Sequence, residues 1–309
     1  MNKAKIIMYH YVRPIKESEF SQIKGLEVVG FQRQITFFEN NFEIAGVDFL
    51  LNSMNLQKNE NKERVILTFD DGLKDHYNHV FPILKDKGIQ GLFFPPAKPI
   101  IENIVLDVHK IHFILATVKD KSVLVKDVFD KIKEHQSEYE VDEPQNLWKK
   151  LAIPNRFDSA EIIFVKRILQ RELPQDMRKT IAKELFEKYV SNDERDFSKQ
   201  LYLSFDEIDE MREHGMYFSS HGYSHEWLSY LSYKMLENEI KNSIIFCKRI
   251  NPDNEQIMCY PYGNFDLRVI EKIKEFNFQA GLTTEVGDAE LDESNRFKLK
   301  RYDTNDFPQ

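Results

Sequence analysis

The sequence predicts an α/β protein whose parallel strands close, or nearly close, into a barrel, with a helical insertion near the middle. Short apolar runs alternate with helical stripes at three-to-four spacing over residues 1–100 and again over 201–309. Seven or eight strand-helix units favour a barrel over an open sheet. Residues 101–200 contain no glycine and carry 19 acidic and 18 basic residues, which indicates a solvated helical insertion.

The first barrel segment, residues 1–100, contains three predicted strands and two predicted helices. Apolar residues at one-face spacing indicate the helices, and Gly88 is a typical stop signal for the second of them. The strand before the two aspartates ends directly at them. The predicted strands are 5–11, 64–69 and 91–95, and the predicted helices are 31–41 and 80–87.

The second barrel segment, residues 201–309, begins with a capping box. Ser204 and Glu207 have the spacing of this motif, which predicts a helix running to Glu213. Three of the predicted barrel strands end at polar clusters, at 70–72, 221–225 and 260–263, and active sites of barrels gather at such ends. The predicted strands of this segment are 216–220, 256–260, 279–284 and 297–302, and the other helices are 234–250 and 267–276.

Composition excludes several classes of protein. The 309 residues are 41% hydrophobic, enough for a packed core. Acidic residues number 51 against 43 basic ones, without a concentrated basic patch, so we expect no nucleic-acid partner. Cys247 and Cys259 lack a Cys-x-x-Cys spacing and are expected to be buried thiols. The apolar runs are too short for a transmembrane segment or a signal-peptide core, which predicts a cytoplasmic location.

Two adjacent carboxylates, Asp70 and Asp71, follow the second predicted strand and precede Gly72. Burying an unpaired charge is costly, so each carboxylate needs a partner. A tight turn would also explain this segment, because Asp-Gly is a common turn signal. The segment alone leaves both interpretations open.

Two histidines four residues apart, His221 and His225, supply the missing partners. This spacing lets both imidazoles face one metal ion, although such a pair also occurs by chance. Two histidines and one aspartate leave open positions on a divalent ion for water and substrate, as a hydrolytic metal requires.

The third polar cluster follows the predicted strand 256–260, where Pro261 lies between two tyrosines and Gly263 follows. Such a rigid turn could aim a backbone N–H at a developing oxyanion and present a ring to a sugar. An ordinary turn between a strand and a helix would have the same composition.

Three motifs occur in a specific order: Thr-Phe-Asp-Asp-Gly at 68–72, Ser-His-Gly-Tyr-Ser-His at 220–225, and Tyr-Pro-Tyr-Gly at 260–263. Together they resemble the polysaccharide deacetylase family, also called carbohydrate esterase family 4 or the NodB homology domain. Met-Tyr-His-Tyr-Val at 8–12 is similar to the start of many members. The resemblance implies a deformed (β/α)7-type barrel and a metal-dependent hydrolase that removes the N-acetyl group from an amino sugar in a polysaccharide, glycolipid or precursor.

The resemblance also implies roles for individual residues. Asp71, His221 and His225 would bind the metal, zinc or another divalent transition ion. Asp70 would be the catalytic base, and the backbone N–H of Tyr262 would stabilise the oxyanion. This division agrees with the chemistry, since a metal acidifies its bound water and an unligated neighbouring carboxylate can take the proton.

The sequence departs from the family pattern in two places. The family often has an arginine before the Pro-Tyr turn that holds the catalytic aspartate, and residues 257–260 contain none. Arg301, at the last predicted strand, is our candidate for this role, with a surface arginine as the alternative. The family's late Leu-x-His acid is also absent. His10, at the end of the first predicted strand, is the candidate acid, and His109 and His112 are further candidates.

Two other functions remain open. The same metal site could hydrolyse another amide or an O-acetyl ester. Alternatively, the chain could be a sugar-binding domain with weak catalysis, its missing arginine and late histidine reflecting lost turnover. The predicted metal ligands together with Asp70 argue against a pure binding module, which has no need of them.

Overall fold

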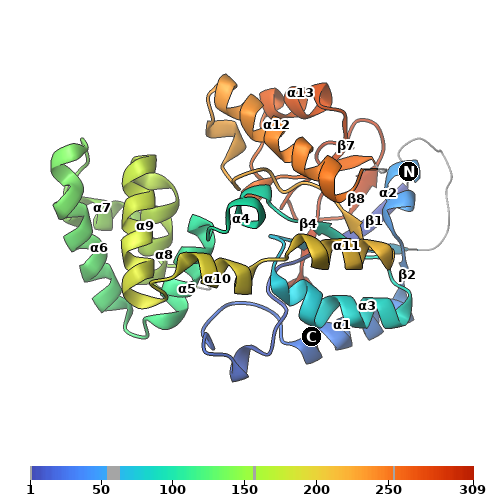
Figure 1. Ribbon diagram of the computed structural model, residues 1–309, viewed down its shortest axis with the longest axis horizontal. Coiled ribbons are helices and arrows are strands. Elements are labelled where there is room, and N and C mark those ends of the chain that lie inside the picture. Colours follow the sequence, from blue (N-terminus) through green and yellow to red (C-terminus); the bar gives the residue numbers. More distant parts are fainter. Residues whose placement is uncertain (1, 54–62, 156–157, 253–254) are drawn as a thin grey trace. The chain divides into compact units, whose positions relative to one another are not determined.

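The computed structural model describes residues 2–53, 63–155, 158–252 and 255–309, and the chain forms two compact units (Figure 1). The barrel unit runs to Pro14 and continues over Gly25–Asn103 and Ser198–Gln309. The helical unit consists of Ile15–Lys24 and Ile104–Phe197. Residues 15–24 therefore pack with the helical unit, although they were expected to belong to the barrel.

In the main sheet of the barrel unit the central strand is β3 (Arg64–Asp70), which is buried along almost its whole length. It pairs in parallel with β1 (Asn2–Tyr9) on one side and with β4 (Leu92–Phe94) on the other, and β4 pairs with β5 (Tyr217–Phe218). Aligned rings link the four strands, because Phe69 stacks on Tyr9 and Phe93, and Phe93 stacks on Phe218. Such stacked pairs stabilise a core by about 0.5–1.5 kcal/mol each beyond their burial.

A second sheet of β6 (Gln256–Cys259) and β7 (Phe278–Leu282) completes the ring. A parallel bridge between Ser220 and Met258 joins it to the end of β5. On the other side, Leu299 bridges Leu282, and β9 (Tyr302–Asp303) pairs in parallel with β1. The arrangement is a deformed α/β barrel, as predicted.

Two short strands were not predicted, and the predicted strand 297–302 is wrong, since only the bridge at Leu299 and the first residue of β9 lie within it. β8 (Ala289–Leu291) pairs antiparallel with β1, so the sheet is mixed where the sequence predicts parallel strands alone. β2 (Glu43–Ile44) adds a two-residue pairing with β3. Neither segment is long enough to form the apolar run from which a strand is predicted.

The helices of the barrel unit follow the predicted pattern. The capping box of Ser204 and Glu207 is present, and Gly88 ends α3 in the left-handed conformation, as expected. A π-helical turn at His76–Val80 was not predicted. The helices are α1 (Val28–Asn41), α2 (Val47–Ser53), α3 (Phe81–Lys87), α4 (Ala97–Glu102), α11 (Phe205–Glu213), α12 (Tyr233–Ile250) and α13 (Leu267–Glu275), with 3-10 turns at Leu228–Tyr230, Pro261–Gly263 and Thr304–Asp306.

The helical unit packs its helices around buried aliphatic side chains and an aromatic cluster of Phe129, Trp148 and Phe164. Asp158 forms ion pairs with Lys166 and with Lys24, which lies in the 15–24 segment. The helices are α5 (Asp107–Thr117), α6 (Lys121–His135), α7 (Pro144–Leu151), α8 (Ala160–Arg167), α9 (Gln175–Tyr189) and the start of α10 (Glu194–Leu201).

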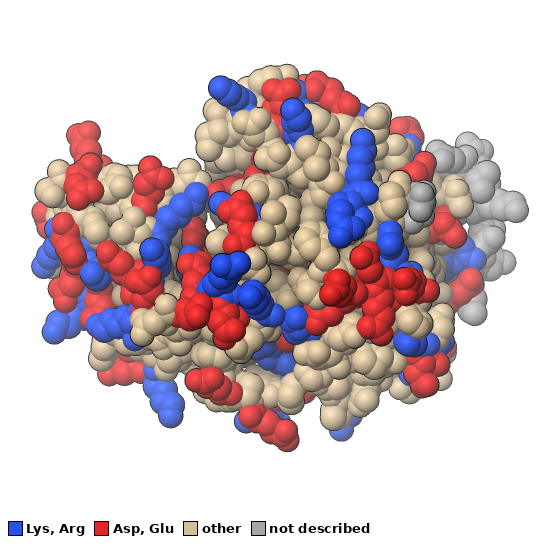
Figure 2. All heavy atoms as spheres, viewed as in Figure 1, with Lys and Arg blue, Asp and Glu red and all other residues tan. Residues whose placement is uncertain are grey.

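Acidic and basic side chains are intermixed on the face shown in Figure 2. Ion pairs join many of the charged side chains, for example Lys131 with Glu134 and Glu184 in the helical unit. Across the described ranges, no helix combines the length and the apolar character that a membrane crossing needs.

Candidate metal and catalytic site

The two aspartates lie at the C-terminal end of β3, where the chain turns sharply. Asp70 is the last residue of the strand, and Asp71 and Gly72 both have a positive φ, 74° and 60°. A Cβ at Gly72 would lie 2.6 Å from the Cβ of Pro95, so only glycine fits this close approach. Both aspartates are buried, with exposed fractions of 1% and 4%.

Asp70 is held by Arg301 through two parallel hydrogen bonds. Arg301 donates from Nη1 to Oδ1 at 2.9 Å and from Nη2 to Oδ2 at 2.8 Å, and its Nε donates to the carbonyl of Thr283 at 2.7 Å. Burial alone would raise the pKa of Asp70, but the Arg301 charge and hydrogen bonds lower it to about 2. Asp70 is therefore an ionised, oriented carboxylate at neutral pH.

Asp71 faces the two histidines instead. Its Oδ1 lies 3.5 Å from Nε2 of His221 and 3.4 Å from Nε2 of His225. All three side chains are buried, and their potential ligand atoms lie within 4.8 Å of one another. The two adjacent aspartates thus have different partners.

This spacing fits a divalent metal ion. Two ligand atoms about 2.0–2.1 Å from a tetrahedral zinc ion lie about 3.3–3.4 Å apart. The oxygen of Asp71 has nearly that separation from each of the two histidine nitrogens. One carboxylate and two imidazoles also leave coordination positions open, as a catalytic zinc site requires.

The tautomer of His221 suits a metal ligand. Its Nδ1 lies 2.8 Å from the carbonyl oxygen of Cys259, and in the neutral imidazole donation to this oxygen leaves the Nε2 lone pair facing Asp71. Burial alone would lower the pKa of His221, but Cys259 and the carboxylates of Asp71 and Asp70 raise it well above its usual range. The surroundings of this imidazole therefore favour a positive charge.

The backbone is strained at each of the three polar clusters. Asp71, His225 and Tyr262 have φ values of 74°, 58° and 58°, in the left-handed region that residues with a Cβ rarely adopt. Among the described residues other than glycine, only Asn103 and Asn277 share this region. Strained residues of this kind persist where the surrounding structure fixes them, and they cluster at functional sites.

Tyr262 lies beside the histidines. Its ring packs edge-on against His225, with centroids 4.6 Å apart, and stacks on Trp227 at 4.3 Å with an interplanar angle of 6°. The left-handed backbone at Tyr262 belongs to the 3-10 turn that leaves β6, the turn expected to carry the oxyanion donor.

His10 also reaches the site. Its Nε2 lies 3.9 Å from Oδ2 of Asp70, and its side chain is 40% exposed. The ring of His76 in the π-helical turn makes a 2.9 Å contact with the backbone carbonyl of His10. The other candidate acids, His109 and His112, belong to α5 in the helical unit.

Three side chains around the site were not foreseen from the sequence. Trp227 follows the second histidine closely, and an aromatic residue near a metal motif is a signal that could have identified it. Cys259, expected only as a buried thiol, forms a second possible metal-binding group with Asp70 and His221. Glu239, in the middle of α12, is 7% exposed and bonds to the loop between the two histidines. The local sequence does not show which partner its carboxylate binds.

The sequence of this chain matches a known protein family. The sequence profile described as "Polysaccharide deacetylase" matches residues 57–136 and 186–281, together more than half of the chain. These segments contain the two aspartates, the two histidines and the Pro-Tyr turn. A search of the curated proteins finds no match to this sequence.

Solved structures share the fold at low sequence identity. The deacetylase PplD of Streptococcus pyogenes, in complex with acetate, is 16% identical with a TM-score of 0.61, over 98% of this chain and 92% of that one. The de-N-acetylase of Aggregatibacter actinomycetemcomitans is 15% identical with a TM-score of 0.55, over 98% and 96%. IcaB of Ammonifex degensii is 15% identical with a TM-score of 0.52, over 97% and 91%.

The ordered motifs, the barrel that brings them together and the profile match lead to one conclusion. The chain belongs to the polysaccharide deacetylase family, and it is a carbohydrate deacetylase of the metal-dependent hydrolase class.

Proposed function

We propose that Asp71, His221 and His225 hold one divalent transition ion, zinc in the first instance, and that Asp70 is the base that removes a proton from the attacking water. One observation carries this proposal. The two adjacent aspartates are held differently, Asp71 beside two imidazole nitrogens and Asp70 in a bidentate contact with Arg301. A metal ligand and a free base are the two roles that such a division serves.

A divalent ion at this site would acidify a water molecule and polarise the acetamide carbonyl. Arg301 keeps Asp70 ionised and fixes its direction, so that Asp70 can accept the proton of the water as it attacks. The backbone N–H of Tyr262 donates to the developing oxyanion. The C–N bond then breaks as an acid protonates the nitrogen, giving acetate and the free amine.

An N-acetylated amino sugar is the proposed substrate. The stacked rings of Trp227 and Tyr262 beside His225 offer apolar faces of the kind that pack against a sugar. The names of two similar structures support this choice, since one is a de-N-acetylase and another was solved with acetate, the expected acid product. A cytoplasmic location remains a prediction from the sequence, which cell fractionation would test.

Acetate release and metal content test the proposal together. The purified protein should bind about one zinc ion and release acetate from a chitooligosaccharide or from a nucleotide-linked N-acetyl sugar. Asp70→Asn should lower this activity on the order of 10²–10⁴-fold while zinc content stays at the wild-type level. Asp86→Asn, at an exposed position of α3, is the control and should keep full activity.

Two results would redirect this assignment. Full zinc occupancy without acetate release from any amide or ester would favour the sugar-binding alternative. Release from O-acetyl esters but not from N-acetyl sugars would instead identify an esterase, because the same site can attack either carbonyl.

We further propose His10 as the acid that protonates the leaving nitrogen, because its Nε2 lies 3.9 Å from Oδ2 of Asp70 and its side chain is partly exposed. His10→Ala should lower turnover on the order of 100-fold, the lower range for general acid catalysis. His79→Ala, on the π-helical turn, is the matched control. Turnover of His10→Ala near that of the wild type would remove His10 from the mechanism.

A further inference from the structure

We infer that Glu239 is a positioning residue whose carboxylate fixes the loop between the two histidine ligands and thereby sets the affinity of the site for metal. The inference rests on the proposed function, because it assumes that His221 and His225 bind the ion. Glu239 itself belongs to α12 and contacts the loop at residues 223 and 224, between the two histidines.

Glu239 makes three hydrogen bonds to this loop. Its Oε1 accepts from the backbone N–H of Tyr223 at 2.9 Å and of Ser224 at 2.6 Å. Its Oε2 accepts from the hydroxyl of Ser224 at 2.7 Å. The loop presents only donors at this point, and an ionised carboxylate is an acceptor-only group, so the two match chemically. Because Glu239 is only 7% exposed, water cannot easily replace these hydrogen bonds.

The opposite side of the loop is held by α4. The backbone N–H groups of Ala97 and Lys98 donate to the carbonyls of Gly222 at 3.2 Å and Tyr223 at 2.8 Å. These donors lie in the first turn of α4, where N–H groups have no partner within the helix. Two backbone N–H groups and two carbonyls of an irregular loop are thus paired by fixed elements on both sides.

Gly222 allows the carboxylate to approach this closely. Its φ is 76°, and a Cβ there would lie 3.2 Å from Oε1 of Glu239 and 3.3 Å from Cγ of Pro261. His225, at the end of the loop, has a strained left-handed backbone and therefore needs support from its surroundings. Glu239 provides that support immediately before His225.

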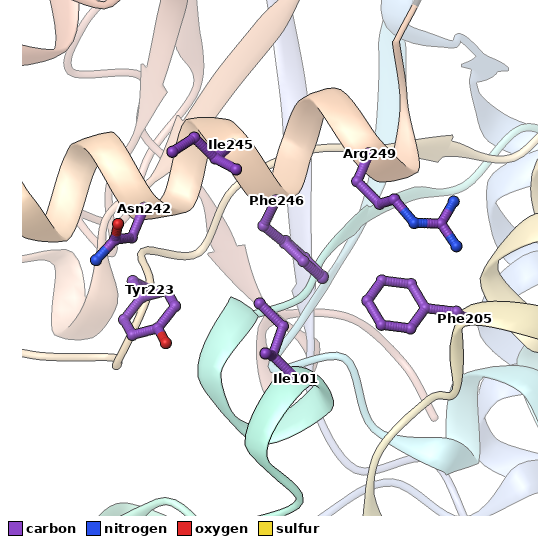
Figure 3. A pocket seen from close by; sticks show the side chains of 7 residues that line it. All are labelled: Ile101, Phe205, Tyr223, Asn242, Ile245, Phe246 and Arg249. Carbon is purple, nitrogen blue, oxygen red and sulfur yellow. The ribbon is translucent and has the colours of Figure 1, made fainter.

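The side chain of Tyr223, in the same loop, helps to line a pocket of about 410 Å³ (Figure 3). The Tyr223 ring and Asn242 lie at one end of this pocket, with Phe246 and Ile101 nearer its middle. The hydroxyl of Tyr223 donates to Glu102 at 2.7 Å. The loop is therefore connected to α12 through Glu239 and to α4 through both backbone and side chain.

Metal affinity is the property that this inference predicts. Glu239→Ala should weaken zinc binding on the order of 10- to 100-fold, the range for removing a group that orients a metal ligand. Glu239→Gln should stay near the wild type, because its amide oxygen can accept both backbone bonds and its amide nitrogen can donate to Ser224. Glu237→Ala, two residues away on α12, is the matched control and should not change affinity.

The experiment measures zinc affinity of the metal-free proteins by competition with a chromophoric chelator, with the visible spectrum of bound Co²⁺ as a second readout. Circular dichroism establishes that each variant is folded at the measuring temperature. A folded Glu239→Ala with wild-type zinc affinity and an unchanged Co²⁺ spectrum would overturn the inference. So would a loss in Glu239→Gln as large as that in Glu239→Ala.

Two further outcomes are separable. If Glu239→Ala does not fold, Ser224→Ala removes only the Oε2 bond, and unchanged zinc affinity in this folded variant would overturn the part of the inference that rests on that bond. If the wild-type protein binds no metal, the proposed function fails first. If the wild type binds zinc and the Glu239 variants bind it equally well, only the positioning role fails.

Discussion

The barrel unit and the helical unit differ in how they treat backbone conformation. Every described residue with a left-handed backbone belongs to the barrel unit, and three of them, Asp71, His225 and Tyr262, lie in the candidate site. The helical unit contains no glycine and, over its described residues, no residue with a positive φ. Strain is therefore concentrated in the unit that carries the proposed chemistry.

The two units also differ in where they place charge. In the barrel unit Asp70, Asp71 and Arg301 are almost completely buried, within a few ångströms of the histidines. Charged pairs in the helical unit are mostly near the surface, and its buried Lys110 is paired with Glu194. Buried charges are costly and need partners, so we expect the chemistry to lie in the barrel unit and the helical unit to serve packing.

The largest expected effect comes from removing Arg301. Arg301→Ala leaves Asp70 buried without its cation, which should cost about 3–5 kcal/mol of unfolding free energy. It should also lower acetate release on the order of 100-fold or more, because the base loses its orientation. Urea unfolding and steady-state kinetics measure the two effects.

Arg296→Ala is the control for Arg301, since Arg296 lies nearby in sequence and also donates to a backbone carbonyl. It should destabilise the protein less and leave turnover unchanged. Equal losses in both variants would mean that Arg301 supports the fold alone and has no role in orienting Asp70.

A smaller effect, on stability alone, is expected in the helical unit. Leu124 is fully buried in α6, and Leu124→Ala should lower the unfolding free energy of this unit by about 2–4 kcal/mol. The two tryptophans lie one in each unit, so Trp148 fluorescence in a Trp227→Phe background reports on the helical unit.

The turnover of Leu124→Ala should match that of the protein with Leu124 intact at temperatures where both are folded. A drop in turnover of tenfold or more would contradict the assignment of the helical unit to packing, because it would make this unit part of the working site. The same test with Ile181→Val, a milder cavity in α9, should give a proportionally smaller loss of stability.

The smallest effect concerns an ion pair and its pH dependence. Burial alone would raise the pKa of Asp158, but its bonds to Lys166 and Lys24 lower it overall. A carboxylate with a lowered pKa stabilises the folded state above its unfolded pKa of about 4 and loses this contribution as pH falls further. Asp158→Asn should therefore destabilise the helical unit by about 1 kcal/mol at pH 7 and much less near pH 3. A difference that does not change with pH would mean that packing, not charge, links 15–24 to the unit.

Much of the barrel could be predicted because its signals are local. Ser204 and Glu207 specify a helix start within four residues, and the buried run of β3 is readable on its own. The antiparallel β8 is only three residues long, and its pairing with β1 depends on residues far away in the sequence. The π-helical turn at His76–Val80 likewise has no local signature, since tertiary packing decides it.

The candidate site shows the same limit. The motifs identify Asp70, Asp71 and both histidines, and the position of Arg301 near a strand end makes it a candidate. The catalytic roles of all these residues remain predictions. Glu239 was not singled out. Its place beside Leu236 and Ile240 puts it on the buried side of an amphipathic helix, but this pattern does not say what its carboxylate binds. Its importance lies in partners supplied by another segment, which a single sequence does not display.

The location of Arg301 has a consequence for the order of assembly. Arg301 lies between Leu299, which bridges β7, and β9, which pairs with β1. The pairing of β9 with β1 joins segments almost 300 residues apart, and such distant contacts are among the slowest to form in a folding chain. The carboxylate of Asp70 acquires its cation only when this segment closes the ring. The contact that orients the base therefore depends on closure of the barrel by a segment that is distant in the sequence.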